Sequence, residues 1–377
     1  MVKKMKSILD LPDEIILRVI NYLNINIRVK FGKVLKRMRA ISCDKNLRQK
    51  MNLSRDGPSW RYEIDIPTKF VKMVIENGCQ YLSLHYMKVG TPGGPISKTS
   101  EGHLILDKAS SLKYLDLKYC EAHVLTFEEI LASCHSLEKL SMASIRERKL
   151  ITTKMIRSIC YQNGSTLQTL DLSSSRGLNL ESIQMITQNC VGLKNVNFYN
   201  IGLSKVSISY LVNNLTPEVE KLGIGSLREL KDEHVKALVT RCNKLSVLNL
   251  QRTEITNNSL NHIVENLQQT LEKLDVYGCY GITYAKLVTL KSMPKLKDLR
   301  SMGTYGPYEK EHLNNVMPFV RFNDRITADE KELCPADGIW DVEARQLEFQ
   351  FQDLAINDWP SLVDPYNIQY IFPALNS

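Results

Sequence analysis

The side chains best suited to chemistry in this 377-residue chain are aromatic, basic and amide groups that recur at a fixed spacing. These candidates are Tyr199, Lys221, Gln251, Arg252, Lys273 and Tyr277. Tyr199, Gln251 and Tyr277 are separated by 52 and 26 residues, and the two lysines by 52. Aromatic and arginine side chains are enriched at protein–protein interfaces. The pattern therefore predicts a surface that binds a target protein.

Groups that usually carry catalysis are present without the spacing that catalysis needs. The seven histidines form no H-E-x-x-H pair, no G-x-S-x-G is found, and the nine cysteines include no C-x-x-C. The glycine-rich stretch at 90–95 is broken by prolines and precedes no Lys-Ser/Thr helix start. We therefore expect no enzymatic activity, no cofactor and no metal, and we expect free thiols instead of disulfides.

The fixed spacing comes from a repeated segment of the form L-x-x-L-x-L, which is apolar at its positions 1, 4 and 6. Clear copies begin at residues 112, 137, 167, 193, 219, 245, 271 and 296, and a looser copy begins at Cys79. A stretch with helical periodicity, such as Leu260–Leu267, follows each copy. One strand and one helix per unit of this length predict an α/β fold, a leucine-rich-repeat solenoid or horseshoe.

In such a coil the side chains at positions 3, 5 and 7 of each unit should face outward from the strand, because side chains alternate along a strand. Lys221 and Lys273 occupy position 3, and Tyr199, Gln251 and Tyr277 occupy position 7. Gly223 and Gly225 share one strand, where they predict a flat gap that could receive a partner.

The segment 11–54 lies outside the repeat and predicts three short helices. Leu11-Pro12-Asp13-Glu14 is a helix start signal, since proline suits the first turn and acids face the positive end of the helix dipole. An apolar stripe continues to Leu23, and a third piece begins at Asp44. A plain helical cap of the solenoid would explain the stripe, but it would need neither this start signal nor the basic charge.

This segment resembles an F-box in its L-P-D-E opening, its apolar helix ending in Y-L, its V-x-K-R element and its closing L-R-x-x-x-L. With the repeats, the chain resembles the F-box/leucine-rich-repeat substrate receptors of SCF (cullin-RING) ubiquitin ligases. The stretch 339–349 is similar to the tail of the S-phase-kinase-associated receptor. The resemblance implies that the F-box binds a small adaptor and through it a cullin, while the repeats hold a protein substrate. It assigns adaptor binding to Leu11, Pro12, Asp13, Glu14, Ile16, Leu35, Met38 and Arg48.

The chain departs from that family at two positions. Met38 and Arg48 stand where members usually carry tryptophan, which predicts a weaker adaptor contact or one rebuilt with smaller side chains. The departure keeps a second hypothesis open, in which the chain is a protein-binding scaffold or inhibitor that does not assemble into a ligase.

Charge is distributed unevenly along the chain, whose net charge is +8. Residues 1–54 carry 13 basic and 4 acidic side chains, whereas residues 323–377 carry 3 and 11. The basic start suits an acidic adaptor better than nucleic acid, because no aromatic stacking platform accompanies it. The acidic end is expected to fold back over the basic repeats, anchored by Ile339 and Trp340.

These observations give a domain plan and a location. The plan has a basic tail (1–6), the F-box (7–54), a linker and solenoid entry (55–78), the repeats (79–322) and an acidic tail (323–377). No run of about 18 apolar residues and no signal sequence is present, so we expect no membrane partner and a place in the nucleus, the cytoplasm or both.

Overall fold

The computed structural model describes residues 111–122, 124–145, 151–301 and 307–322, with shorter stretches at 12, 15–16, 50–52, 65–66, 75, 78–84 and 88–89. The chain divides into two compact units, Met1–His135 with Gln346–Ser377, and Ser136–Arg345. Among the described residues, no helix is long and apolar enough to span a membrane. The same residues hold no cluster of His, Cys, Asp and Glu that could bind a metal ion.

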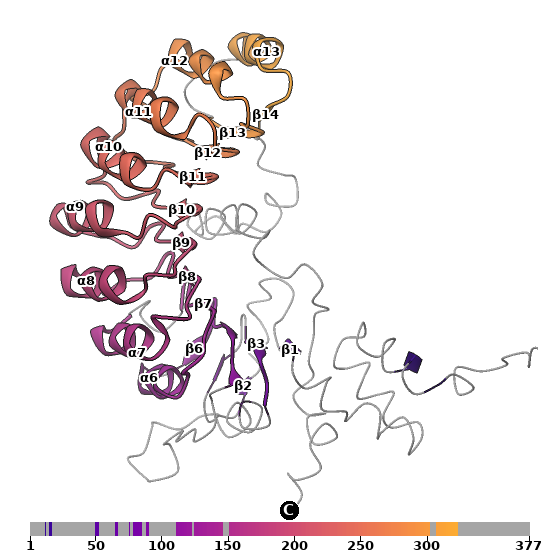
Figure 1. Cartoon of the computed structure of the whole chain (residues 1–377), viewed down its shortest axis with the longest axis vertical. Helices are drawn as coiled ribbons and strands as arrows, with labels where there is room; N and C mark the ends of the chain where they lie inside the picture. Colours follow the sequence, from indigo (N-terminus) through magenta and orange to yellow (C-terminus); the bar gives the residue numbers. More distant parts are fainter. Residues whose placement is uncertain are drawn as a thin grey trace, which may run out of the picture. The chain divides into compact units, whose positions relative to one another are not determined.

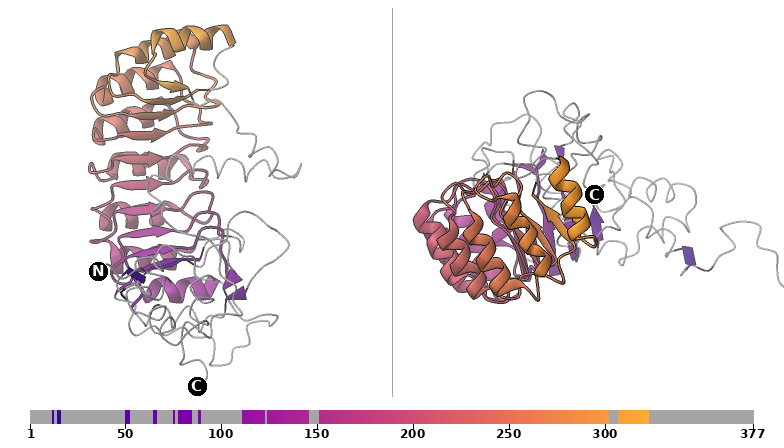
Figure 2. Two further views of the ribbon diagram at one scale, coloured as in Figure 1. Left: turned by 90° about the vertical axis from the view of Figure 1, so that its right-hand side faces the viewer. Right: turned by 90° about the horizontal axis from the view of Figure 1, so that it is seen from above.

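The second unit alternates short parallel strands with helices (Figure 1). Its elements are β7 (Lys139–Ser141), α7 (Thr153–Asn163), β8 (Thr169–Asp171), α8 (Leu180–Asn189), β9 (Asn195–Asn197), α9 (Lys205–Asn214), β10 (Lys221–Gly223), α10 (Asp232–Arg241), β11 (Val247–Asn249), α11 (Asn257–Leu267), β12 (Lys273–Asp275), α12 (Tyr284–Val288), the 3-10 turn η3 (Thr289–Ser292), β13 (Asp298–Arg300), α13 (Pro307–Val316) and β14 (Arg321–Phe322). Each strand pairs in register with the next, so Val196, Leu222 and Leu248 are direct neighbours. The helices lie on one side of this sheet, as Figure 1 and the right-hand view of Figure 2 show. This arrangement confirms the predicted leucine-rich-repeat solenoid.

Among the described residues of the first unit are two small parallel groups of strands and the helix α6. One group is β1 (Lys50–Asn52), β3 (Tyr81–Ser83) and β5 (Tyr114–Asp116), and the other is β2 (Asp65–Ile66), β4 (Lys88–Val89) and β6 (Glu121–Ala122). The helix α6 spans Val124–Ala132. The sequence placed Lys50–Asn52 in the third helical piece, and that prediction is wrong. These residues form a strand beside Tyr81–Ser83, because pairing with the repeat sheet outweighs the local helical pattern.

The core is built from the three apolar positions of every unit. In the unit that begins at residue 193, Leu193, Val196 and Phe198 are all 0% exposed. Burying one side chain of this kind contributes about 1.5–3 kcal/mol, but only when a neighbouring coil covers it. Each coil therefore depends on the next for its stability.

Cysteines fill small spaces between the coils, as their spacing predicted. All seven cysteines in the described part of the chain are free and buried. The thiol of Cys242 donates to the carbonyl of Thr216 one coil earlier, at 3.5 Å. Burial raises the pKa of Cys134 to about 12 and that of Cys242 to about 11. These two thiols therefore stay protonated at neutral pH, which fits a packing role.

The strands β5, β8, β9, β11 and β12 end in the same turn. The side chain at position 5 accepts a hydrogen bond from the position-7 N–H, as in Asp171 with Ser173 (3.0 Å) and Asn249 with Gln251 (3.0 Å). The residue at position 8 is left-handed in successive coils, with φ of +49° to +56° at Ser144, Ser174, Asn200, Ser226 and Arg252 and +67° at Gly278. Its N–H donates to the position-7 carbonyl of the following coil, for example Asn200 to Gly225 at 3.0 Å.

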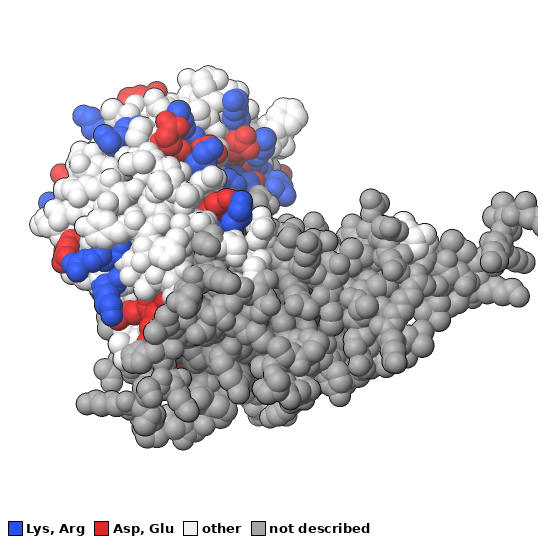
Figure 3. Space-filling model, turned by 60° about the horizontal axis from the view of Figure 1, so that its bottom comes forward, with Lys and Arg blue, Asp and Glu red and all other residues white. Residues whose placement is uncertain are grey.

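Exposed ion pairs also join neighbouring coils. Lys244 contacts Glu218 at 2.7 Å, and Lys297 contacts Glu272 at 2.8 Å. On the face that Figure 3 shows, basic and acidic side chains accordingly lie next to one another. Such exposed pairs contribute little to stability, since the median is about 0–1 kcal/mol.

A buried histidine joins two coils at the start of α10. His234 is 3% exposed, its Nδ1 accepts from the N–H of Lys231 at 3.0 Å, and its Nε2 lies 3.0 Å from Ser209 Oγ on α9. Because Nδ1 accepts, Nε2 must carry the proton and donate to Ser209. Burial lowers the pKa of His234, and this effect outweighs the nearby carboxylate of Glu233.

This lowered pKa predicts acid sensitivity. An unfolded histidine titrates near pH 6.5, so the stability that neutral His234 supports is complete above that pH. It is lost progressively as the pH falls below 6.5 toward the folded pKa. His234→Asn keeps an acceptor for the Lys231 N–H but cannot be protonated. Melting temperatures measured between pH 7.0 and 5.0 should fall less steeply in this variant, and equal slopes would contradict the assignment.

Candidate protein-binding site

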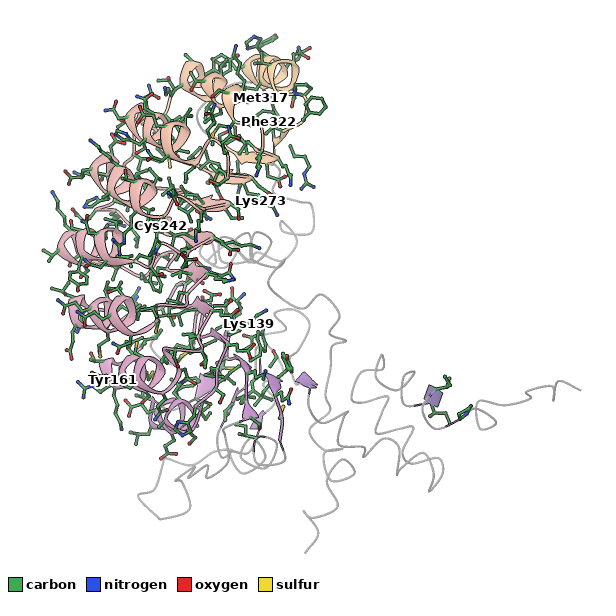
Figure 4. The ribbon with its side chains drawn as sticks, viewed as in Figure 1. Lys139, Tyr161, Cys242, Lys273, Met317 and Phe322 are labelled. Carbon is green, nitrogen blue, oxygen red and sulfur yellow. The ribbon has the colours of Figure 1, made fainter. Side chains whose placement is uncertain are left out.

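We call the outward side of strands β7 to β14 the strand face. Lys139 and Lys273 lie on this side of the unit, whereas Tyr161 lies on the helix side (Figure 4). Of the six predicted target-binding residues, Arg252 is exposed, and Lys221, Lys273 and Tyr277 are half-buried. The prediction of outward exposure is wrong for Tyr199 and Gln251, each 1% exposed. The strand ends at position 5, so position 7 belongs to the turn, where alternation no longer dictates direction.

Two arginines and one tyrosine form a cluster across three neighbouring coils. The guanidinium carbon of Arg252 lies 5.6 Å from the ring centre of Tyr277, and that of Arg300 lies 4.7 Å from it. Both distances fall within the range of cation–π attraction, worth about 0.5–1 kcal/mol at exposed sites and about 2 kcal/mol when desolvated. We call Arg252, Tyr277, Arg300 and Asp275 the arginine–tyrosine cluster.

Asp275 fixes the geometry of this cluster. Its carboxylate accepts from the N–H of Tyr277 at 3.0 Å and lies 3.6 Å from Arg300 Nη1. The side chains of Asp275 and Arg300 are 1% and 12% exposed, so this ion pair is shielded from solvent. A buried carboxylate requires such partners, and it holds Arg300 beside the ring. Asp275 is therefore a positioning residue.

Arg252 adopts its place at a conformational cost. Its φ is +55°, a left-handed value that glycine and asparagine tolerate best. The equivalent positions of neighbouring coils are Asn200, Ser226 and Gly278. Gly278 leaves room for the stem of Arg252, because a Cβ there would lie 3.1 Å from Arg252 Cγ. The left-handed conformation therefore belongs to the turn of the repeat, and the arginine at this position is what distinguishes the coil of β11.

The sequence alone did not select Arg300 and Asp275. Both occupy position 5 of adjacent units and are 25 residues apart, with opposite charge. Opposite charges at equivalent positions of neighbouring coils are a readable signal, because those positions pair directly, as Asp275 and Arg300 do in β12 and β13. Four other predicted residues lie outside the cluster, and two of them, Tyr199 and Lys221, make no contact with it among the interactions of the described residues.

The sequence predicted a flat gap at Gly223 and Gly225, and that prediction is wrong at Gly225. A Cβ there would lie 2.7 Å from Asn249 Oδ1, 2.8 Å from the carbonyl oxygen of Gln251 and 2.9 Å from Gln251 Cγ. The space beside Gly225 is thus filled by the following coil, and the glycine is required for close packing.

Gly225→Ala should therefore destabilise the protein by about 1–3 kcal/mol, since two of the three contacts are rigidly held. Gly192→Ala is a matched control, because the nearest atom to a Cβ there is the Leu167 carbonyl oxygen at 3.6 Å. It should change stability by no more than about 0.5 kcal/mol. Chemical denaturation measures both, and equal effects of the two alanines would refute the packing role.

Comparison with known protein families agrees with this geometry. The family model of the SKP2 LRR domain matches residues 88–332, about two thirds of the chain, and the F-box domain model matches residues 8–50. The chain belongs to the SKP2-type F-box/leucine-rich-repeat family. These two domains together support a general role as substrate receptor of an SCF ligase, and members of this kind are typically non-catalytic.

The SKP2-type domain order has its F-box at the N-terminus, as the sequence predicted. Of the predicted adaptor-binding residues, the structure describes two. Pro12 is exposed, and its carbonyl accepts from the N–H groups of Ile15 and Ile16 at 3.1 Å, which starts a helical turn. Ile16 is 0% exposed, so its side chain belongs to the interior, whereas Ile15 is 41% exposed. Leu11, Asp13, Glu14, Leu35, Met38, Arg48, and the tail residues Ile339 and Trp340, lie outside the described residues.

Proposed function

We propose that this protein is the substrate-recognition subunit of an SCF-type ubiquitin ligase. Its F-box binds the adaptor that links it to a cullin, and its strand face presents a target protein for ubiquitination by the partners. The family match over both domains carries this proposal. The physical mechanism is proximity, because holding a target lysine near the ubiquitin carrier makes an intermolecular reaction effectively intramolecular.

The arginine–tyrosine cluster is the proposed anchor for the target. It combines an exposed guanidinium, a half-buried ring and a second guanidinium held by Asp275. Tyrosine and arginine side chains of this kind dominate the binding energy of protein interfaces. The exposed guanidinium of Arg252 suits a target segment that carries a carboxylate, since guanidinium and carboxylate can form paired hydrogen bonds. Lys221 and Lys273 would extend the basic surface.

The adaptor interaction is tested most simply with the double variant Leu11→Ala, Pro12→Ala. The purified full chain should bind the F-box-binding adaptor of the SCF complex, and the double variant should lose that binding while keeping its melting temperature. The reason is that the contact is local to the F-box.

Tyr277→Ala serves as the control in this experiment, and it should retain adaptor binding because Tyr277 lies in the repeats. If the wild-type chain fails to bind the adaptor, the alternative function as a scaffold or inhibitor outside a ligase is favoured.

We further propose that the acidic segment 323–377 lies over the strand face, anchored by Ile339 and Trp340. Supporting this, the segment carries 3 basic and 11 acidic side chains, whereas residues 55–322 carry 33 and 26. Exposed ion pairs alone would add little, so apolar anchors must supply most of the docking energy. A docked tail would form part of the wall around the target or control access to it.

Hydrogen exchange on the full chain and on a chain ending at Asn323 tests the docked tail. Amides between Tyr199 and Tyr277 should exchange faster in the shortened chain, because their cover has been removed. The proposal fails if protection there is the same in both chains and residues 339–351 exchange as fast as a free peptide.

A further inference from the structure

Two cysteine side chains are in direct contact between adjacent coils. Cys160 lies on α7, and Cys190 directly follows α8. The thiol of Cys190 donates to Cys160 Sγ, and the two sulfur atoms are 3.7 Å apart. Both residues are buried, Cys160 with 2% and Cys190 with 1% of its surface exposed. The contact joins two sulfurs that are 30 residues apart in the chain.

The repeat explains why this contact is unusual. Cys190 stands three residues before a repeat start, as Cys134 and Cys242 do, and the thiols of those two donate to main-chain carbonyl oxygens. Cys160 stands seven residues before the repeat start at residue 167. At the same position the next three coils carry buried aliphatic side chains, Ile186, Val212 and Leu238. The sulfur pair therefore exists because a second cysteine replaces an aliphatic core residue in one coil.

The main chains of the two coils also approach closely beside the sulfur pair. Gly164 follows Cys160 by one helical turn, and its N–H donates to the Cys160 carbonyl at 3.0 Å. A Cβ at Gly164 would lie 2.6 Å from the carbonyl oxygen of Asn189, the residue before Cys190. Glycine is thus required for this approach. Two cysteines can be joined only where their main chains come this near, because a disulfide needs Cα atoms within about 7 Å.

We infer that Cys160 and Cys190 form a site of reversible oxidation, at which a small peroxide joins them in a disulfide between adjacent coils. This inference goes beyond the proposed function and does not depend on it. One thiolate attacks a peroxide oxygen and breaks the O–O bond, which gives a sulfenic acid and releases the other oxygen as water. The second thiolate attacks the sulfenic sulfur, forms the S–S bond and displaces hydroxide, which takes up a proton. Two thiols and one hydrogen peroxide thus give one disulfide and two water molecules.

Burial determines when this reaction takes place. The hydrogen bond with Cys190 and burial both raise the pKa of the Cys160 thiol, so little thiolate forms while the coils are closed. Oxidation therefore proceeds through transient opening between the two coils, which a repeat array permits because each coil contacts only its neighbours. Once one sulfur is oxidised, the other is already beside it and completes the disulfide.

Hydrogen peroxide applied to the reduced full chain, followed by peptide mapping without reductant, tests this site. Urea below the unfolding transition is included to increase opening of the coils. The expected product is a pair of peptides joined through Cys160 and Cys190, and dithiothreitol should return both to thiols. The rate of joining should rise with pH and with urea. The oxidised chain should melt about 5–10 °C higher than the reduced chain, because the link closes a loop of 30 residues.

Cys190→Ala should abolish both the joined peptides and the rise in melting temperature. Cys242→Ala is the matched control, since Cys242 occupies the same repeat position as Cys190 but donates to the Thr216 carbonyl. This variant should keep both effects. The peptide map of the wild-type chain decides the question even if an alanine variant does not fold.

Three results would overturn the inference. In the first, Cys160 and Cys190 remain thiols, or become separate sulfinic acids, after the peroxide has been consumed. In the second, they are joined to other cysteines as often as to each other. In the third, the disulfide lowers the melting temperature, which would show that the two side chains are not placed for joining. Adaptor binding should be retained by Cys190→Ala in every case, so these results leave the proposed function unaffected.

Discussion

The structure depends on the turn that follows the repeat strands. In five coils a side-chain oxygen at position 5 accepts the position-7 N–H. A left-handed residue at position 8 donates its own N–H to the next coil, as Ser174 does to the carbonyl of Tyr199 at 2.8 Å. This hydrogen bonding fixes the register between coils. With the register fixed, the apolar positions of one coil meet those of the next and leave water together.

The same turn creates the candidate binding site. Position 5 serves the turn in most coils, but in the coil of β12 its carboxylate, Asp275, also holds Arg300 from the next coil. Position 8 is serine, asparagine or glycine in the coils between residues 137 and 278, except that Arg252 occupies it beside Tyr277. At this end of the unit, positions 5 and 8, which form the turn of the repeat, thus also carry the charged side chains of the candidate site. These side chains lower the stability of the unit there, but they form a surface that can bind a protein.

The period of the leucines was sufficient to predict the strands, the helices and the buried positions, because those depend on contacts that every coil repeats. It did not predict that Gln251 would be buried or that Asp275 would bind Arg300, since these contacts depend on particular pairs across coils. The helical pattern near Met51 was misleading for a related reason. Pairing of Lys50–Asn52 with Tyr81–Ser83 depends on a strand 31 residues away.

In the proposed function, the F-box engages the adaptor while the strand face stays available for a target. Cross-linking of the adaptor complex with a lysine-reactive reagent, followed by mass spectrometry, tests this claim directly. The account predicts cross-links from the adaptor to F-box lysines such as Lys30, Lys33 and Lys36, and none to Lys221 or Lys273. Cross-links concentrated on Lys221 and Lys273, with the F-box lysines unmodified by the adaptor, would contradict it.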